Sequence, residues 1–211
     1  MTPSSVLTGW SFVCGSDGTV PLSNADDATL IERFLRADDE SAFEILVRRY
    51  QEKVFGLAAS ILGRGDESEV EDATQEVFII VLRKLKSFRG ESAFATWLYR
   101  VARNQIVDYR RRACRRALRS SESILWAIPD SGSFTDPQEA VTVAGRQARL
   151  MNHVDRLHEP QRVVVYLHYW QERSIAEIAE LLGIPPSTVK SHLFRARQGL
   201  AKALREDERD E

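Results

Sequence analysis

The sequence predicts an all-α protein with two small helical domains joined by a flexible linker, the C-terminal domain being a helix-turn-helix. Apolar residues recur at intervals of three and four along most of the chain, which is the period of an amphipathic helix. The segment 117–140 lacks this period and contains Pro129, Gly132 and Pro137, which is typical of a linker. Residues 174–197 carry start and stop signals for two short helices, and these signals indicate the helix-turn-helix.

The predicted N-terminal domain, residues 26–116, contains a succession of helices. Its apolar pattern predicts helices over residues 30–35, 43–61, 69–88 and 93–116. Gly63 and Gly65 follow the second of these helices and are expected to break it. The run 77–82 would also fit a buried strand by periodicity, but the helix formers around it favour a helix that is buried on most sides.

The remaining segments differ in composition. Residues 1–25 are rich in Ser, Thr and Gly and are predicted to form a flexible arm. The C-terminal domain is expected over residues 141–205, with one helix around Leu150 and another running from Pro160 through Tyr169 before the helix-turn-helix. An acidic tail, residues 206–211, ends the sequence.

The helix-turn-helix prediction depends on signals that coincide. Ser174 and Glu177 have the spacing of a capping box, and Gly183 suits a helix end where φ is positive. Pro185 and Pro186 suit the first turn of the next helix. That second helix would bury Val189, Leu193 and Ala196 and expose Lys190, Ser191, Phe194, Arg195 and Arg197. A basic outer face on a second helix is typical of a reader of the DNA major groove, whereas an ordinary helical hairpin is the alternative.

Charge is distributed unevenly along the chain. The net charge is only −2, yet the end of the fourth predicted helix carries Arg100, Arg103, Arg110, Arg111, Arg112, Arg115, Arg116 and Arg119 against one acid, Asp108. The following linker and the tail are acidic. Guanidinium groups crowded at one helix end repel each other unless a polyanion neutralises them, so this segment predicts nucleic-acid binding, with a solvated helix face as the alternative.

Other side chains near the basic segment suit single-stranded nucleic acid. Phe88 lies in a predicted loop, where its ring could contact an unstacked base, whereas Trp97 shares a face with Val101 and is expected to pack in the core. Asn104 lies among the arginines, and its amide could read a base edge. On the third predicted helix Asp72, Gln75 and Glu76 share a face that suits a basic partner surface, although a solvated face is the alternative.

Several function classes find no support in the sequence. Cys14 and Cys114 form neither a disulfide framework nor a zinc motif, which fits a reducing, cytoplasmic compartment. The chain has no apolar run of membrane-spanning length and no signal-peptide pattern. The four histidines lack metal-ligand spacing, and we find no phosphate loop or nucleophile motif. We therefore expect no enzymatic activity, no cofactor and no metal.

These segments, taken in order, resemble the extracytoplasmic-function (ECF) sigma factors of the sigma-70 family. The resemblance extends from about Asp26 to Leu204. Residues 39–50 resemble the opening of conserved region 2, and residues 71–78 resemble its polymerase-binding helix. Residues 88–111 resemble the promoter-melting segment, and residues 157–162 and 174–197 resemble region 4. The sequence departs from the family at Ser187, where Gly is usual, and we expect little effect because Ser also allows a helix start.

The resemblance implies a role for each candidate residue. Binding to the core polymerase, at the clamp helices of its largest subunit, is implied for Asp72, Gln75, Glu76 and Phe78. Binding to the minus-ten promoter element is implied for Phe88, Arg100, Arg103, Asn104, Arg110 and Arg111, with Phe88 and Asn104 capturing flipped bases. Reading of the minus-thirty-five duplex is implied for Ser187, Thr188, Lys190, Ser191, Phe194 and Arg195.

The expected partners are core RNA polymerase, promoter DNA and, as is common in the family, an anti-sigma factor that is often membrane-bound. No small-molecule substrate is expected. Two other functions remain open at this point. A stand-alone helix-turn-helix regulator would bind duplex DNA without polymerase, and a nucleic-acid enzyme such as a recombinase would need a catalytic constellation that we do not find in the first domain.

Overall fold

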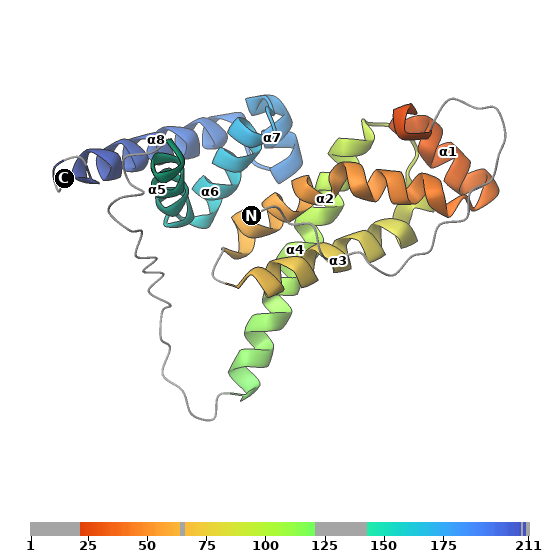
Figure 1. The fold of residues 1–211 in the computed structure, drawn as a ribbon, viewed down its shortest axis with the longest axis horizontal. Helices are drawn as coiled ribbons and strands as arrows, with labels where there is room; N and C mark the ends of the chain where they lie inside the picture. The colour runs from red at the N-terminus through yellow and green to blue at the C-terminus, as the bar shows by residue number, and fades with distance from the viewer. Residues whose placement is uncertain (1–21, 64–65, 121–142, 208, 210–211) are drawn as a thin grey trace.

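The computed structural model describes residues 22–63, 66–120, 143–207 and 209, and every regular element in these ranges is helical (Figure 1). The predicted all-α class is therefore confirmed. The predicted arm before residue 22, the predicted linker (117–140) from residue 121 onward and the last residues of the predicted tail lie outside the described residues. Residues 117–120, predicted to be linker, are helical. A first group of helices, α1 to α4, and a second group, α5 to α8, pack separately and also contact each other.

Three of the four helices in the first group begin at an aspartate cap. Helix α1 spans Asp27–Ala37, α2 spans Glu40–Leu62, α3 spans Glu67–Lys84 and α4 spans Phe94–Ser120. The carboxylates of Asp26, Asp39 and Asp66 accept hydrogen bonds from backbone N–H groups at the starts of α1, α2 and α3. An aspartate cap satisfies donors that have no partner within the helix, and its charge suits the positive end of the helix dipole.

The core of this group surrounds α2, which packs against α1, α3 and α4. Its fully buried side chains include Leu30 of α1, Leu57 of α2, Val77 of α3 and Ile106 of α4. A polar clamp also joins α1 to α2, because Asp27 accepts hydrogen bonds from both Arg49 and Tyr50. Burial and the adjacent Asp27 carboxylate raise the pKa of Tyr50 above its ordinary value.

The second group contains the C-terminal helices. Helix α5 spans Val143–Asp155, α6 spans Glu159–Val165, α7 spans Ile175–Leu182 and α8 spans Pro186–Asp207. A π-helical turn, η4 (Tyr166–Trp170), follows α6 directly. Helix α8 packs against α5, α6 and α7, and its buried side chains are Val189, Leu193 and Ala196.

The structure corrects several details of the prediction. Helix α3 ends at Lys84 and continues as a 3-10 turn, η2 (Leu85–Ser87), and it is not buried on most sides because Ile79 and Leu82 are 49% and 41% exposed. The end of the predicted arm is ordered from Leu22, in a 3-10 turn, η1 (Leu22–Asn24), and Arg49 donates a 2.8 Å hydrogen bond to the Ala25 carbonyl.

The two helical groups share one continuous core. Helix α2 contacts α6 and η4, and α4 contacts α7. Buried side chains of both groups belong to a single hydrophobic cluster. The sequence predicted two domains joined by a flexible linker, and the packing of one domain on the other was not predicted.

Candidate nucleic-acid interface

The helix-turn-helix forms as the sequence predicts. The Ser174 hydroxyl accepts a hydrogen bond from the Glu177 backbone N–H at 3.2 Å, and the Glu177 carboxylate accepts one from the Ser174 backbone N–H at 2.9 Å. These two bonds complete the capping box. Bonding to Ser174, helped by the Arg173 guanidinium, lowers the pKa of Glu177 from 4.5 to about 2. Gly183 ends α7 with a φ of 66°, a backbone conformation that glycine adopts without a Cβ clash.

The candidate duplex-reading residues lie on the first half of α8. Val189, Leu193 and Ala196 anchor the buried face of the helix, so the residues between them point outward. Thr188 is half-buried, and the exposed residues are Ser187, Lys190, Ser191, Phe194 and Arg195. The Ser191 hydroxyl bonds to the Ser187 carbonyl at 2.9 Å, as serine often does in a helix interior. The Phe194 ring is 60% exposed.

The candidate minus-ten residues on α4 share one helix but differ in exposure. Asn104 is exposed, and the neighbouring Arg100 and Arg103 are half-buried. Arg110 is half-buried and Arg111 is exposed one to two turns further on. The last turns of α4 extend beyond the neighbouring helices of the first group (Figure 1). This face offers a linear basic track with an amide in it, which suits a nucleic-acid backbone together with a base edge.

Phe88 lies in the loop before α4, as the sequence predicts, but its ring is not freely exposed. It is half-buried, and its ring centroid lies 5.7 Å from that of Phe94 and 5.3 Å from that of Trp97. Trp97 is also half-buried and packs against the core, in line with its predicted role. The three rings form an aromatic cluster at the start of α4, and this cluster holds Phe88 beside the basic track.

The candidate polymerase-binding residues lie along α3. Asp72 and Gln75 are exposed, whereas Glu76 is half-buried and accepts hydrogen bonds from Arg112 and, at 3.0 Å, from Gln105 of α4. Phe78 is half-buried against the core. The exposed apolar side chains of this helix are Ile79 and Leu82, which the sequence analysis missed. Positions 72, 75, 79 and 82 follow one another at intervals of three and four, so Ile79 and Leu82 continue the polar stripe along the same face. This periodicity could have identified them.

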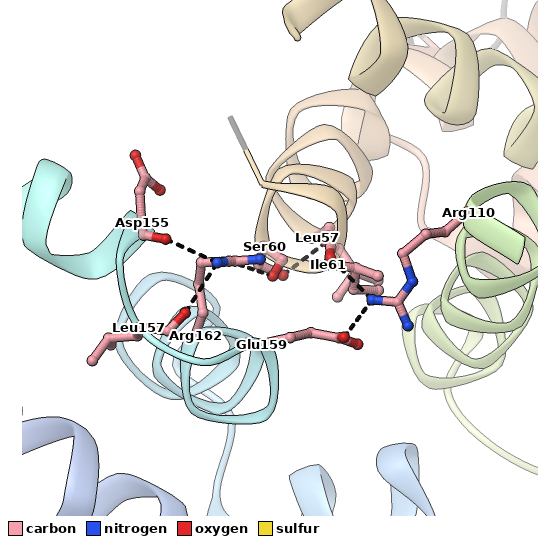
Figure 2. A network of polar contacts seen from close by, with 8 residues as sticks. All are labelled: Leu57, Ser60, Ile61, Arg110, Asp155, Leu157, Glu159 and Arg162. Atoms are coloured by element: carbon pink, nitrogen blue, oxygen red, sulfur yellow. Dashed lines mark hydrogen bonds and ion pairs between the residues drawn. The ribbon is translucent and has the colours of Figure 1, made fainter. Parts of the chain in front are cut away.

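A polar network joins the two helical groups, and no local sequence pattern predicted it (Figure 2). The Arg162 guanidinium of α6 donates to the Ser60 carbonyl of α2 at 2.7 Å and also to the carbonyls of Asp155 and Leu157. Glu159 of α6 accepts a hydrogen bond from Arg110 of α4. Burial lowers the pKa of Arg162, which reflects the cost of enclosing this cation between the two groups.

No metal-binding group is evident in the part of the chain that the structure describes, where no cluster of three or more His, Cys, Asp and Glu side chains could hold an ion. The helices among the described residues are also too short or too polar to cross a membrane.

The fold thus defines a helix-turn-helix protein that carries basic residues on α4 and on α8, in separate helical groups. Two family models match these groups. The model for sigma-70 region 2 matches residues 46–116, and the model for sigma-70 region 4 matches residues 147–200.

Curated relatives match nearly the whole chain. The RNA polymerase sigma-H factor of Pseudomonas aeruginosa is 34% identical over 191 residues, which cover 87% of this chain and 96% of the relative. The ECF RNA polymerase sigma-E factor of Escherichia coli is 35% identical over 179 residues, covering 82% and 92%. The chain belongs to the sigma-70 family, as an ECF sigma factor. It is accordingly a non-enzymatic RNA polymerase subunit for transcription initiation.

Solved structures show the same fold. The chain aligns with CnrH, solved in complex with the cytosolic domain of CnrY, at a TM-score of 0.58 and 26% identity over 86% of this chain and 98% of that one. It also aligns with the sigma factor RpoE of Bartonella quintana, solved with the anti-sigma factor NepR, at a TM-score of 0.58 and 21% identity over 77% and 96%.

Proposed function

We propose that α4 captures the melted minus-ten strand, that α8 reads the minus-thirty-five duplex and that α3 docks on core RNA polymerase. The observation that carries this proposal is the placement of Asn104, which is exposed on α4 next to half-buried Arg100 and Arg103. An exposed amide beside two cations can pair with a base edge while the guanidinium groups hold the adjacent phosphates.

Capture of the strand offsets the free energy of promoter melting. Unstacking costs on the order of 1–2 kcal/mol per base-pair step, so several favourable contacts are needed to hold a short open segment. Arg100, Arg103, Arg110 and Arg111 supply salt-dependent backbone contacts. Phe88 is half-buried beside Phe94 and Trp97, which hold its ring in place, and the exposed part of that ring can contact an unstacked base.

The outer face of α8 suits duplex reading. Arg195 can form two hydrogen bonds with a guanine in the major groove, and Phe194 can pack on a thymine methyl group. Ser187, Thr188, Lys190 and Ser191 lie nearer the start of the helix, where backbone N–H groups and short side chains contact phosphates. Each element alone offers few base contacts, so promoter choice would require both.

The stripe on α3 suits the polymerase. Asp72, Gln75 and Glu76 provide polar contacts, and the exposed Ile79 and Leu82 provide the apolar surface that an interface centre needs. Phe78 supports this stripe from the core side. The match of both sigma regions to one chain favours this reading over a stand-alone helix-turn-helix regulator.

An anti-sigma factor is a further proposed partner of this chain. The structures of CnrH and of RpoE were each solved with a binding protein, CnrY and NepR respectively. The CnrH likeness, at 26% identity, supports a similar regulator here. We place the protein in the cytoplasm, where polymerase and promoter DNA are found.

Asn104→Ala tests the minus-ten assignment. The variant should bind core polymerase normally but open the promoter poorly, because it removes a base contact that exists only in the melted state. Permanganate reactivity of unpaired thymines measures opening, and native gel shift of the holoenzyme measures core binding. Asn152→Ala, on α5, is the matched control. Unchanged permanganate reactivity in Asn104→Ala would remove Asn104 from the site.

A further inference from the structure

An exposed tyrosine and an exposed arginine meet beside the second helix of the helix-turn-helix. Tyr169 lies in the π-helical turn η4 and is 51% exposed, and Arg197 is exposed on α8. The Arg197 Nε donates a hydrogen bond to the Tyr169 hydroxyl at 2.7 Å, and the guanidinium carbon lies 5.7 Å from the centroid of the Tyr169 ring. Two contacts of different kinds therefore hold one surface arginine in a defined position.

The other side of Tyr169 is fixed as well. The half-buried His168 ring makes a T-shaped contact with the Tyr169 ring, with the centroids 4.9 Å apart and the planes at 72°. His168 Nδ1 lies 3.0 Å from the Arg173 carbonyl. Because a carbonyl only accepts, this nitrogen carries the proton and donates. Tyr169 is therefore held between Arg197 and a histidine whose own ring is anchored to the backbone.

The pair keeps hydrogen-bond donors for a ligand. A tyrosine hydroxyl that accepts a hydrogen bond still has its own proton to donate, and an arginine that donates through Nε still has both Nη groups. In the part of the chain that the structure describes, Arg197 makes no ion pair, whereas Arg173 of the same group pairs with Glu177 at 2.9 Å. A guanidinium that no carboxylate neutralises, with a hydroxyl beside it, suits a phosphate through charge-assisted hydrogen bonds.

Arg197 lies at the border of the candidate reading surface. Lys190, Phe194 and Arg197 follow one another at intervals of four and three, so they lie along one stripe of α8. Arg197 comes about three turns after the start of the helix at Pro186. The N-terminal residues of such a helix contact base edges in the major groove. A cation later in the helix and beside the reading surface is placed for the sugar-phosphate backbone instead.

We infer that Tyr169 and Arg197 form a clamp for one phosphate of the DNA backbone at the border of the minus-thirty-five element. This inference rests on the proposed reading of that duplex by α8. The Arg197 Nη groups and the Tyr169 hydroxyl donate to the phosphate oxygens, and Tyr169 holds the guanidinium in place before DNA arrives. The clamp recognises no base, so it adds affinity and orientation but no sequence choice.

Arg197→Gln removes the charge of the clamp, and salt dependence reports the loss. Each phosphate that a cation neutralises releases counterions, so affinity falls with salt more steeply when more phosphates are contacted. The probe is a duplex that carries the minus-thirty-five region of a promoter transcribed by the holoenzyme in vitro. Fluorescence anisotropy follows holoenzyme binding, with core polymerase alone as background. We expect Arg197→Gln to bind about tenfold more weakly and to reduce the slope of log affinity against log salt by about one.

Two further variants separate this role from a purely structural one. Arg197→Lys keeps the charge and should keep the slope of the parent. Arg205→Gln removes an equal charge later in α8, outside the clamp, and should also leave the slope unchanged. Urea unfolding followed by circular dichroism establishes that each variant is folded. An arginine that only braces η4 against α8 would change the free energy of unfolding and not the slope, so an unchanged slope in folded Arg197→Gln would overturn the inference.

Neutral phosphates locate the contact on the DNA. A methylphosphonate linkage replaces one charged phosphate oxygen by a methyl group, and a set of duplexes carries this change at successive positions. At one phosphate bordering the minus-thirty-five element we expect the parent to lose affinity and Arg197→Gln to lose nothing further, because the residue and the phosphate act as a pair. Equal losses in the parent and in Arg197→Gln at every position would overturn the inference.

Tyr169→Phe tests the other half of the clamp. It keeps the ring and removes the hydroxyl, so binding should weaken about threefold and the same phosphate should become less sensitive to methylphosphonate. In the Arg197→Gln background the substitution should have little further effect, because the two side chains bind one phosphate together. An equal effect in both backgrounds would remove Tyr169 from the clamp. If Arg197→Gln fails to fold, the phosphate scan with Tyr169→Phe decides the question, and an unchanged scan would overturn the inference.

A duplex with a scrambled minus-thirty-five sequence keeps the two proposals distinguishable. The parent holoenzyme should prefer the promoter duplex, and Arg197→Gln should weaken binding to both duplexes by the same factor. If the parent shows this preference but Arg197→Gln matches it in salt slope and phosphate scan, the clamp alone is wrong. If the parent shows no preference, the reading of the duplex by α8 fails, and the clamp built on it fails too.

Discussion

Phe194 and Arg195 are adjacent on α8, and both are exposed on its outer face. Phe194 is 60% exposed, the largest value among the large apolar side chains of the described residues. An aromatic ring and a guanidinium side by side offer two different kinds of base contact, one for a methyl group and one for paired acceptors. Their neighbours Leu193 and Ala196 are buried, so the backbone that presents them is held firmly.

Arg195→Ala should weaken minus-thirty-five binding by about 1–3 kcal/mol and relax the choice of base at one position. The reason is that a guanidinium with two hydrogen bonds to guanine discriminates against the other bases. Competition binding of holoenzyme to a set of promoters, each changed at one base, measures both effects. Arg205→Ala, at the far end of the same helix, removes an equal charge as the control. An equal loss on every promoter would leave Arg195 as a phosphate contact.

Ile79→Ser should weaken binding to core polymerase about tenfold, which is roughly 1.4 kcal/mol. Ile79 is 49% exposed, so its removal leaves the core intact and acts on the interface. Titration of fluorescently labelled core with the variant gives the affinity. Leu204→Ser, a change at a 36% exposed leucine of α8, is the control. Equal affinity of Ile79→Ser and the parent chain would restrict the interface to the polar residues of α3.

At the scale of the element, the stability of α7 depends on the residues that cap its start. The helix spans only Ile175–Leu182, and a helix this short needs its cap and its packing to persist. Ser174→Ala should lower the free energy of unfolding by about 1 kcal/mol, because it removes the acceptor for the Glu177 backbone N–H. Urea unfolding followed by circular dichroism measures the loss. Ser68→Ala is the control, since the bond at that residue uses its backbone N–H.

The capping box should also respond to acid. The pKa of Glu177 is lowered in the folded chain, so its contribution to stability is fully present above its ordinary value of 4.5 and is lost as the pH falls toward about 2. Because the Ser174 side chain is the first cause of the shift and alanine keeps only the backbone N–H, Ser174→Ala should show a weaker loss of stability over that range than the parent. The same unfolding measurement between pH 5 and pH 2 checks this. Parallel losses would contradict the role of Ser174.

How far the sequence predicts an element depends on whether local signals decide it. The helix-turn-helix was predicted in detail, because its cap, its glycine end and its buried face all arise from neighbouring residues. Burial of α3 was predicted wrongly at Ile79 and Leu82, since an apolar run does not say which side will be covered. The π-helical turn Tyr166–Trp170 was missed, because the docking of Tyr166 on α2 is a tertiary effect.

At the scale of the whole molecule, the two helical groups form one structure with a continuous core. Sequence patterns could not predict this, because the residues that join the groups are far apart in the sequence, from 49 positions for Arg110 and Glu159 to 113 for Lys53 and Tyr166. These residues are also of common types, and each fits an ordinary helix or loop position in its local sequence. Gly56 could have suggested the contact, because glycine is unfavourable in a helix interior. Its missing side chain makes room for Tyr166 of the other group.

Tyr166→Phe should loosen the docking of the two groups without a steric change. The substitution removes a hydroxyl that donates to the Lys53 carbonyl and accepts from the Gln171 amide, and each such bond contributes about 0.5–1.5 kcal/mol. Because docking couples the groups, the parent chain should unfold in one transition, and the variant should unfold at lower urea with the groups beginning to separate. Fluorescence of Trp170, which stacks on Tyr166, follows the docked contact, while circular dichroism follows the helices.

Tyr169→Phe is the matched control for this prediction, because the Tyr169 hydroxyl accepts a hydrogen bond from Arg197 within the second group. It removes one hydroxyl of the same helical turn but does not touch the boundary with α2. We expect the fluorescence and dichroism transitions to coincide in the parent and in Tyr169→Phe, and to separate in Tyr166→Phe. If Tyr169→Phe separates them equally, the effect comes from η4 itself, and the Tyr166 hydroxyl does not hold the two groups together.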